Sequence, residues 1–464
     1  MRTTPSLRTA WRVSLAILAL SSGPALRLRA TEADELKLLR DQIHALEQKL
    51  LVLERKQEIK DEAAAAAAPT TPKVTINDKG FTLASADAAN TIKLRGLVQL
   101  DSRLFFNDNG IVNNALVLRR ARIITEGTFA KNFTFQLVPE FAGSSVSILD
   151  ANLGVNVSKA LQFKFGRFKS PVGLELLQSD SWTFFNERSI VTNLVPNRDL
   201  GIQASGELYD GRLNYTVGAF GGVADGASTT NTDFDNEKDV VGRIFASPFR
   251  NEAGSPLQGL SFGISASLGR EKTVAGRTGG YRTDGQQTFF SYAATTIADG
   301  QNWRYSPQFD YRNGSFGLQG EYVVSTVNVR PSATGKKTEL QNKAWQLSGG
   351  YVLTGEDSSY AGVVPRTNFD YANGTWGAFE VTARYADLKV DDAAFPVYAA
   401  LASNADEATS IGLGLNWYLS KAVAFKIDYF QTKFGFALGA PAVPSNLVLR
   451  QDEKSLITRF QVSF

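Results

Sequence analysis

The 464-residue chain has no cysteine and a single histidine, His44. The missing cysteines exclude disulfide bonds, thiol catalysis and cysteine-ligated zinc sites. One histidine is too few for a metal site with several histidines, and it leaves the rest of the chain without a Ser-His-Asp triad. G-x-S-x-G turns and phosphate-binding glycine–lysine loops are also missing, which disfavours a barrel lipase or protease and ATP-driven transport. We therefore expect no enzyme, no catalytic residues, no metal and no cofactor.

An excess of charge of one sign is missing from most of the chain. The protein carries 49 Lys+Arg and 46 Asp+Glu. Residues 1–74 hold 12 and 9 of these, which leaves 37 of each sign in residues 75–464. A nucleic-acid-binding domain would carry a basic excess, so we expect no nucleic-acid partner. The abundant residues are 30 Phe, 14 Tyr and 40 Gly, and the length suits several ordinary domains or one large β architecture.

No apolar run at the start of the chain is long enough to span a membrane. Three arginines precede a short apolar run at residues 13–20, and small residues follow it. A membrane helix needs about 20 apolar residues. A basic start, a short apolar run and a small-residue exit are typical of a secretory signal peptide, although a buried soluble helix is the alternative. We place the signal peptide at residues 1–30, with cleavage after Ala25 or Ala30.

Residues 31–62 have a helical repeat. Apolar residues recur there at spacings of three and four, which is the a/d pattern of a coiled coil. The seam consists of Leu36, Leu39, Ile43, Leu46, Leu50 and Leu53. We predict a short coiled-coil helix that depends on the rest of the molecule being oligomeric; a helix packed on its own domain is the alternative. An Ala/Pro/Thr linker at residues 63–74 follows, because proline ends the helix.

From residue 92 onward the apolar residues recur with a period of two. In residues 92–106 one face is apolar and the other carries Lys, Arg and Asp, as expected for a wall between lipid and water. About 16 such strands are predicted, an even number typical of closed outer-membrane barrels. Their spans are 92–106, 116–130, 132–142, 147–158, 160–168, 200–208, 212–221, 238–248, 258–269, 302–312, 315–326, 342–354, 375–388, 408–419, 421–432 and 454–464.

The pattern predicts an all-β fold, a transmembrane antiparallel β-barrel of about 16 strands over residues 75–464, preceded by the short N-terminal coiled-coil helix. Short turns alternate with long links, which is the habit of barrels in the outer membrane of a Gram-negative envelope. The link 355–374 is long where a short turn is expected. A soluble propeller or pair of β-sandwiches is the alternative. Charged polar faces and aromatic residues near the strand ends favour the barrel.

Several short motifs resemble those of a known family. They are Arg119-Arg120-Ala121-Arg122, Glu126-Gly127-Thr128-Phe129, Phe165-Gly166-Arg167-Phe168-Lys169-Ser170-Pro171-Val172-Gly173-Leu174-Glu175, Glu187-Arg188-Ser189, Tyr351-Val352-Leu353-Thr354-Gly355-Glu356, Trp376-Gly377-Ala378-Phe379-Glu380, Ala383-Arg384-Tyr385 and Asn416-Trp417-Tyr418. As an ordered set, they make residues 75–464 similar to the phosphate-selective porin O and P family. The terminal Phe464 is similar to the closing residue of outer-membrane barrels generally.

The resemblance implies a homotrimeric, 16-stranded diffusive channel in outer-membrane lipid. It also implies that the third long loop, residues 169–199, folds into the lumen and narrows it. Family members that select phosphate use stacked lumen arginines and loop lysines. This chain has no Arg-x-Arg-x-Arg ladder. Lys169 matches the lysine that opens the loop motif, and no further lysine follows before residue 200.

The charges that could set selectivity follow from strand parity and from the loop. Parity assigns 13 basic and 10 acidic side chains to the lumen face, a slight anion lean. A pore selects by the charges at its narrowest ring rather than by the sum. The predicted pore-lining and constriction residues are Arg120, Arg122 and Lys164 on the wall and Lys169, Glu175, Glu187 and Arg188 on the loop. The alternative is that these charges form ion pairs that hold the loop and make no ion site.

The sequence therefore predicts a passive outer-membrane porin for small hydrophilic solutes and ions, leaning toward anions, with phosphate among the candidates. The alternative is a structural protein that tethers the envelope, in which the barrel is an anchor and the coiled coil reaches into the periplasm. Both functions fit the heptads. Conductance in a planar bilayer separates them, because a plugged anchor passes little current.

Overall fold

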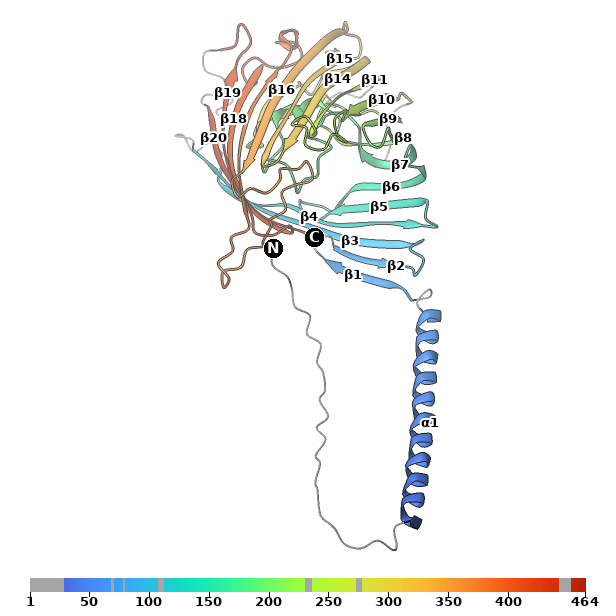
Figure 1. Cartoon of the computed structure of the whole chain (residues 1–464). Coiled ribbons are helices and arrows are strands. Elements are labelled where there is room, and N and C mark those ends of the chain that lie inside the picture. The colour runs from blue at the N-terminus through green and yellow to red at the C-terminus, as the bar shows by residue number, and fades with distance from the viewer. Residues whose placement is uncertain are drawn as a thin grey trace. The chain divides into compact units, whose positions relative to one another are not determined.

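The computed structural model describes residues 29–67, 71–77, 80–106, 112–229, 236–272, 278–441 and 452–464. The chain forms two compact units, residues 1–70 and residues 71–464. The first contains the helix α1 (Arg29–Ala67), and the second contains the sheet (Figure 1). Apart from Arg29 and Ala30, with which α1 begins, the predicted signal peptide at residues 1–30 lies outside the described residues.

The helix α1 is longer than the predicted span of 31–62. It has 39 residues and includes Ala63–Ala67 of the predicted linker. Alanine has the highest helix propensity of all residues, so an alanine run continues a helix until another residue stops it. All six seam residues are exposed to solvent within one copy of the chain. Among the described residues, no helix is both long and apolar enough to cross a membrane.

The described strands of the second unit form an 18-stranded antiparallel sheet and a separate two-stranded hairpin. Two short strands come first, β1 (Lys73–Asn77) and β2 (Gly80–Ala84), and the separate hairpin is β12 (Gly280–Arg282) with β13 (Thr288–Ser291). The barrel wall consists of β3 (Thr91–Phe105), β4 (Ala115–Phe129), β5 (Phe133–Glu140), β6 (Ser147–Ser158), β7 (Leu161–Lys169), β8 (Arg198–Leu208), β9 (Leu213–Phe220), β10 (Asp239–Ala246), β11 (Leu260–Lys272), β14 (Ile297–Asn313), β15 (Phe316–Arg330), β16 (Thr338–Val352), β17 (Ala378–Lys389), β18 (Glu407–Tyr418), β19 (Val423–Gly435) and β20 (Glu453–Ser463).

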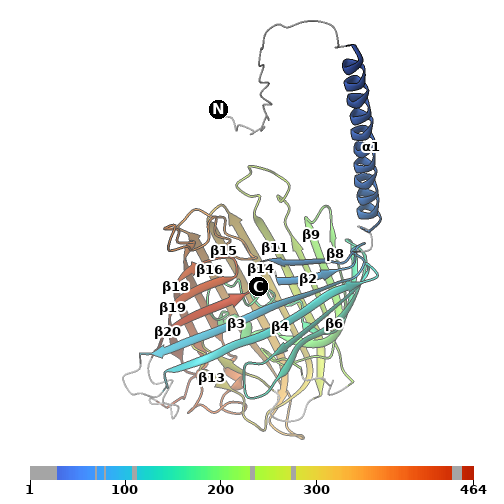
Figure 2. The same cartoon turned by 90° about the horizontal axis from the view of Figure 1, so that it is seen from below.

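The wall closes where its first and last strands pair. Antiparallel pairing of β3 with β20 places Val98 opposite Val462, and Figure 2 shows these strands side by side. The ladder continues to the last residue, because the N–H of Gly96 donates to the carbonyl of Phe464 at 2.9 Å. A Cβ at Gly96 would lie 2.5 Å from the Phe464 ring, so glycine makes room for the terminal aromatic side chain. The predicted closed barrel of 16 strands is confirmed.

The predicted strands all have a counterpart in the wall, and four further strands were not predicted. The hairpins β1–β2 and β12–β13 have strands of five, five, three and four residues. Segments this short contain too few alternations to separate a strand from a loop by periodicity. The link between β16 and β17, residues 353–377, is long, as the sequence indicated, although it lies at the barrel end that carries most of the short turns.

Apolar side chains fill much of the interior of the barrel, and this core includes Phe168, Phe220 and Val241 of the strands β7, β9 and β10. Apolar residues of β15, β16 and β17 point inward and pack against the loop between β7 and β8 and against the hairpin β12–β13. Buried members of this core are Val172, Ile190, Val191, Leu194, Tyr281, Phe290, Val323, Leu340, Ala344 and Leu388. Strand parity alone assigned charges to the lumen face and did not reveal this internal core. The opposite wall, from β3 to β10, faces an open cavity.

The inside–outside assignment can be tested on two neighbouring residues of β5. Leu137 is exposed on the outer face, whereas Gln136 lines the cavity. We expect Leu137→Arg to reduce the yield of folded barrel, because an arginine facing mid-bilayer costs about 2–4 kcal/mol. Gln136→Arg should insert normally, since its charge stays hydrated in the lumen. Heat-modifiable electrophoresis measures the folded fraction, and equal yields would contradict the assignment.

Candidate functional site: a loop held inside the barrel

The loop between β7 and β8, residues 170–197, lies inside the barrel and is almost entirely buried. A short 3-10 helix, η1 (Ile190–Leu194), forms its second half, and the Ser189 side chain caps η1 by accepting a bond from the N–H of Val191. Ile190, Val191 and Leu194 belong to the internal apolar core. Apolar contacts therefore hold η1, and Val172 and Leu176 near the start of the loop join the same core. Polar contacts also hold the residues between them.

Glu187 is the first carboxylate that ties the loop to the wall. Its side chain is 3% exposed and accepts hydrogen bonds from three arginines. These come from β3, from its neighbour β4, and from β20, which closes the barrel by pairing with β3. Arg119 donates at 2.6 Å, Arg103 at 3.1 Å and Arg459 at 3.2 Å. Asp101 completes the group, since it accepts from Arg459 at 2.6 Å. The loop carboxylate of Glu187 thus links β3 and β20, the two strands whose pairing closes the barrel.

Asp180 is the second such carboxylate, at the middle of the loop. It forms ion pairs with Arg122 and Arg188, and its Oδ1 lies 3.3 Å from Arg120. Arg122 also binds Glu140 of β5 at 2.6 Å. Two of these arginines come from β4, so Asp180 connects the loop to the wall that faces the cavity.

A third group of charges connects the loop to the opposite wall. Arg384 of β17 lies 3.3 Å from Glu175 of the loop and 2.6 Å from Asp284 of the turn between β12 and β13. Glu175 also accepts from the N–H of Ser189 at 2.8 Å and from Gln346 at 3.1 Å. Arg384 is therefore one link that the loop and the hairpin share with the barrel wall.

The arginines keep the two clamping carboxylates ionised. Burial alone would raise the pKa of Asp180, but the attraction of Arg120, Arg188 and Arg122 outweighs it and holds that pKa well below its usual range. Burial opposes ionisation of Glu187 in the same way, and Arg119 is the main reason that its pKa is nevertheless lowered. A buried carboxylate that stays charged in this way is expensive to leave without its partner.

The seven predicted site residues fall into two groups. Five of them belong to the ion-pair and hydrogen-bond network of the loop, namely Arg120, Arg122, Glu175, Glu187 and Arg188. Lys164 and Lys169 line the open cavity beside the loop, and Arg122 of the first group lines it as well. Lys169 is engaged there, because its Nζ donates to the carbonyls of Leu176 at 2.6 Å and Gln178 at 3.0 Å.

Sequence reasoning missed Arg119 and Asp180, two of the strongest participants. In β4 the pairing register shifts, so that Gln99 lies opposite Arg120 while Leu100 lies opposite Leu118. Arg119 is the extra residue of this bulge, and both neighbouring arginines therefore reach lumen partners. Two consecutive arginines in an alternating strand were the signal for the bulge. No signal in the sequence fixed the position of Asp180, because it depends on the path of the loop.

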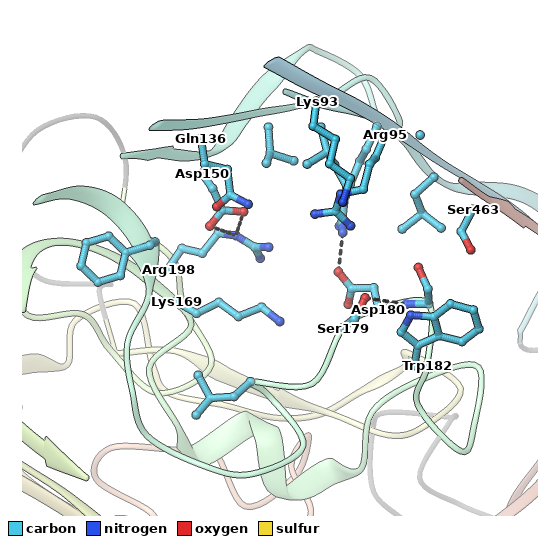
Figure 3. Close-up of a pocket in the computed structure, with 18 of the residues that line it drawn as sticks. Lys93, Arg95, Gln136, Asp150, Lys169, Ser179, Asp180, Trp182, Arg198 and Ser463 are labelled. Carbon is cyan, nitrogen blue, oxygen red and sulfur yellow. Dashed lines mark hydrogen bonds and ion pairs between the residues drawn. The ribbon is translucent and has the colours of Figure 1, made fainter. Parts of the chain in front are cut away.

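The open cavity lies between the loop and the wall from β3 to β10 and has a volume of about 590 Å³. Figure 3 shows Lys93, Arg95, Arg198 and Lys169 around this space, with Asp180 and Trp182 across from them. Each of the eight consecutive strands contributes at least one lining residue. From β3 to β10 these include Lys93, Arg122, Gln136, Asp150, Lys164, Gln203, Thr216 and Arg243.

The lining of this cavity carries eight Lys or Arg side chains and two Asp side chains. Some cations have carboxylate partners. Arg198 lies 3.2 Å from Asp150, and Arg95 lies 2.8 Å from Glu126. Among the described residues, Lys164 and Arg243 form no ion pair within 4 Å; Arg243 donates to the neutral Gln308 at 2.9 Å, and Lys164 lies 5.4 Å from the centre of the Phe168 ring.

A second cavity of about 690 Å³ continues along the same wall. It shares Leu177, Thr216 and Arg243 with the first, so the two spaces meet beside the loop. Its charges are balanced, since Glu207 and Asp310 accompany Arg243 and Arg250. The hollow half of the barrel therefore has a basic section followed by a neutral one, and Arg243 stands at their junction.

A closed 16-stranded barrel with an inward loop beside a charged lumen defines an outer-membrane porin, a channel for small solutes. A model of the phosphate-selective porin O and P family matches residues 92–461. The chain belongs to that family, which consists of channels rather than enzymes.

The relatives agree with this assignment. The chain is 26% identical to Porin O of Pseudomonas aeruginosa over 384 residues, which cover 76% of this chain and 85% of that protein. The fold is similar to that of the outer membrane channel DcaP of Acinetobacter baumannii, with a TM-score of 0.51 and 13% identity over 81% of this chain and 98% of that one. It is also similar to Salmonella typhi OmpF, with a TM-score of 0.52 and 13% identity over 84% and 100% of the two chains.

The clamp predicts a large effect of neutralising Glu187. Glu187→Gln leaves three arginines without their shared carboxylate, and breaking a buried pair in this way costs about 3–5 kcal/mol. We expect a lower melting temperature and faster hydrogen exchange in residues 170–197. Glu126→Gln is the matched control, because it removes a half-exposed carboxylate, for which a loss of at most about 1 kcal/mol is expected.

The effect of Glu187→Gln should also depend on pH in a defined direction. Because the pKa of Glu187 is lowered in the folded protein, its contribution is complete above the ordinary glutamate pKa of about 4.3 and is lost as the pH falls through the lowered value. The difference in free energy of unfolding between wild type and variant should therefore stay constant from pH 7 down to the ordinary glutamate pKa and shrink only at lower pH. A difference that disappears near neutral pH would contradict the clamp.

Proposed function

We propose that this porin conducts small hydrophilic solutes with a preference for anions, and that the preference is set on the wall between β7 and β10. The observation that carries the proposal is the cavity lining, in which cations outnumber carboxylates. Three of these cations, Lys164, Lys169 and Arg243, have no carboxylate partner within 4 Å among the described residues. Lys169 is held by two loop carbonyls, which leaves Lys164 and Arg243 as the two of the three that neither a carboxylate nor the loop binds. Paired charges largely cancel one another at a distance, so the unpaired ones dominate the field that a passing ion meets.

The strength of this field supports selection without tight binding. An anion about 6 Å from one cation gains roughly 3 kcal/mol at an effective dielectric constant of 20 and less than 1 kcal/mol in bulk water. Cavities with walls of low dielectric constant focus such fields. An attraction of a few kcal/mol enriches anions in the cavity, while a weak site still lets them leave, as conduction requires.

The same geometry argues for general anion passage rather than a dedicated phosphate site. A phosphate site would need several donors directed at one point. Lys169 has two of its three donor positions occupied by the carbonyls of Leu176 and Gln178. Arg122 is occupied by Glu140 and Asp180. We therefore propose that phosphate passes as one anion among others, although the chain belongs to a family named for phosphate selectivity.

Selectivity is tested by removing Lys164 and Arg243, which neither a carboxylate nor a loop carbonyl binds among the described residues. In the double variant Lys164→Gln/Arg243→Gln we expect the reversal potential in a potassium chloride gradient to shift from the anion side toward zero. The shift should shrink at high salt, where the Debye length falls to about 3 Å. The measurement uses planar bilayers, with potassium phosphate as a second salt.

The matched control is Lys343→Gln, which removes a lysine that is exposed on the outer face of β16. It should leave the reversal potential unchanged. An unchanged potential in the double variant would show that the selecting charges lie elsewhere. A wild-type barrel that passes almost no current would instead favour the envelope-tether function.

We also propose that the protein assembles as a homotrimer and that α1 forms a parallel coiled coil within it. The six seam residues of α1 are all exposed in one copy, and a stripe of this kind is stable in water only when another helix covers it. A helix of 39 residues is about 58 Å long, which gives three heptads room to pair along the seam. The number three rests on the family resemblance.

The coiled coil is tested on two adjacent leucines of α1. Leu50 lies on the seam and Leu51 does not, and both are exposed in one copy. Leu50→Asp should lower the temperature at which the oligomer dissociates in mild detergent, because it places three carboxylates at one layer of the seam. Leu51→Asp should have little effect. Equal behaviour of the two variants, or a strictly monomeric wild type, would contradict the proposal.

A further inference from the structure

The hairpin β1–β2 extends the sheet past the place where the barrel closes. β2 pairs with the first residues of β3, from Thr91 to Leu94, and β20 pairs with the same strand only from Leu97 onward. Figure 2 shows β2 beside β3. The hairpin is therefore an addition to the wall at the rim where the short turns lie, and it is the first element after the linker that follows α1.

The hairpin has two different faces. One face is polar, and it continues the lumen side of β3 through Thr75, Thr82 and Lys93. The other face is entirely apolar. Register places its members in two adjacent rows of three across the strands, and all six are exposed in one copy of the chain: Val74, Leu83 and Ile92 in one row and Ile76, Phe81 and Leu94 in the other. The most exposed, Ile76, has 77% of its surface open.

The hairpin also has an open edge. Among the described strands, β1 pairs only with β2. Every residue of β1 is exposed, including Val74 at 59%. An exposed edge strand presents backbone donors and acceptors that can pair with another chain.

Neither lipid nor water is a favourable environment for the uncovered β1–β2 hairpin. In lipid, the open edge of β1 would leave backbone groups without hydrogen-bond partners, which costs several kcal/mol for each group. In water, the apolar face would remain as an exposed patch of six large side chains, and such patches mark interaction surfaces. Another protein surface that covers both the face and the edge removes both costs.

We propose that a second copy of this chain covers the apolar face and the open edge of the β1–β2 hairpin. A second copy is favoured over other partners by the position of the hairpin in the chain. Residues 68–72 join α1 to β1, and five residues span at most about 20 Å. If the α1 seams meet on a common axis, each hairpin is held within that distance of the end of a helix bundle, so hairpins of neighbouring copies are brought together. The inference rests in this respect on the proposed assembly through α1.

The absence of natural cysteines allows a direct test. Ile76→Cys in the full-length protein in outer-membrane vesicles, treated with a short bis-maleimide cross-linker, should give covalent dimers, because one thiol per chain allows each linker to join two chains. Thr75→Cys is the matched control. Thr75 is the neighbour of Ile76 in β1 and lies on the polar face, so this variant should give no cross-linked dimer. Equal yields from the two variants, or no product from Ile76→Cys, would overturn the proposal.

A third variant separates this result from the proposed coiled coil. Leu46→Cys places a thiol on the α1 seam. Cross-linking at Leu46→Cys without cross-linking at Ile76→Cys would mean that the helices assemble and the hairpins do not meet, so the inference fails alone. Loss of both products would overturn the hairpin contact and the helix assembly together. In the charged variant Ile76→Glu, the proposal requires a fall in the temperature of oligomer dissociation relative to Thr75→Glu.

Discussion

The arrangement inside the barrel depends on two loop carboxylates buried among wall arginines. Glu187 accepts from arginines of β3, β4 and β20, and Asp180 forms ion pairs with Arg120 and Arg122 of β4. Each carboxylate would be costly to bury alone, and so would each arginine. Loop and wall therefore stabilise one another only as a complete set. The loop cannot swing away from the wall without exposing several buried charges at once, and this fixes the shape of the space that remains.

That space lies on one side of the barrel. Apolar side chains from β15 to β17, the loop and the hairpin β12–β13 fill the other side as a soluble protein core would. Different parts of the interior therefore position the loop and present charge to the lumen. Apolar packing positions the loop, and the cavity wall from β3 to β10 carries cations, of which Lys164, Lys169 and Arg243 have no carboxylate partner within 4 Å among the described residues. A small number of unbalanced charges then decides what the lumen attracts, even though the barrel as a whole is nearly neutral.

The strands of the barrel wall could be predicted from the sequence, whereas the contacts inside the barrel could not. Alternation with a period of two depends only on which face meets lipid, so all sixteen wall strands could be predicted. The inward loop followed from the family resemblance. The pairing of Glu187 with Arg119 could not be predicted, because a bulge in β4 changes which side chains face inward. The inward apolar residues Val323 and Leu340 were also missed, since parity shows that a residue faces the lumen but not whether a loop covers it there.

The pairing of β3 with β20 has a consequence for biogenesis. The strands that close the ring are the first and last of the wall, so their contact has nearly the largest sequence separation that the chain allows. Such a contact forms late, because loop-closure entropy opposes it until the intervening strands are in place. Until Phe464 reaches its position beside Gly96, the growing sheet has two open edges, each able to pair with a wrong strand. A protein factor that covers the open edge of β3 until β20 pairs with it would prevent mispairing at the step of insertion where it is most probable.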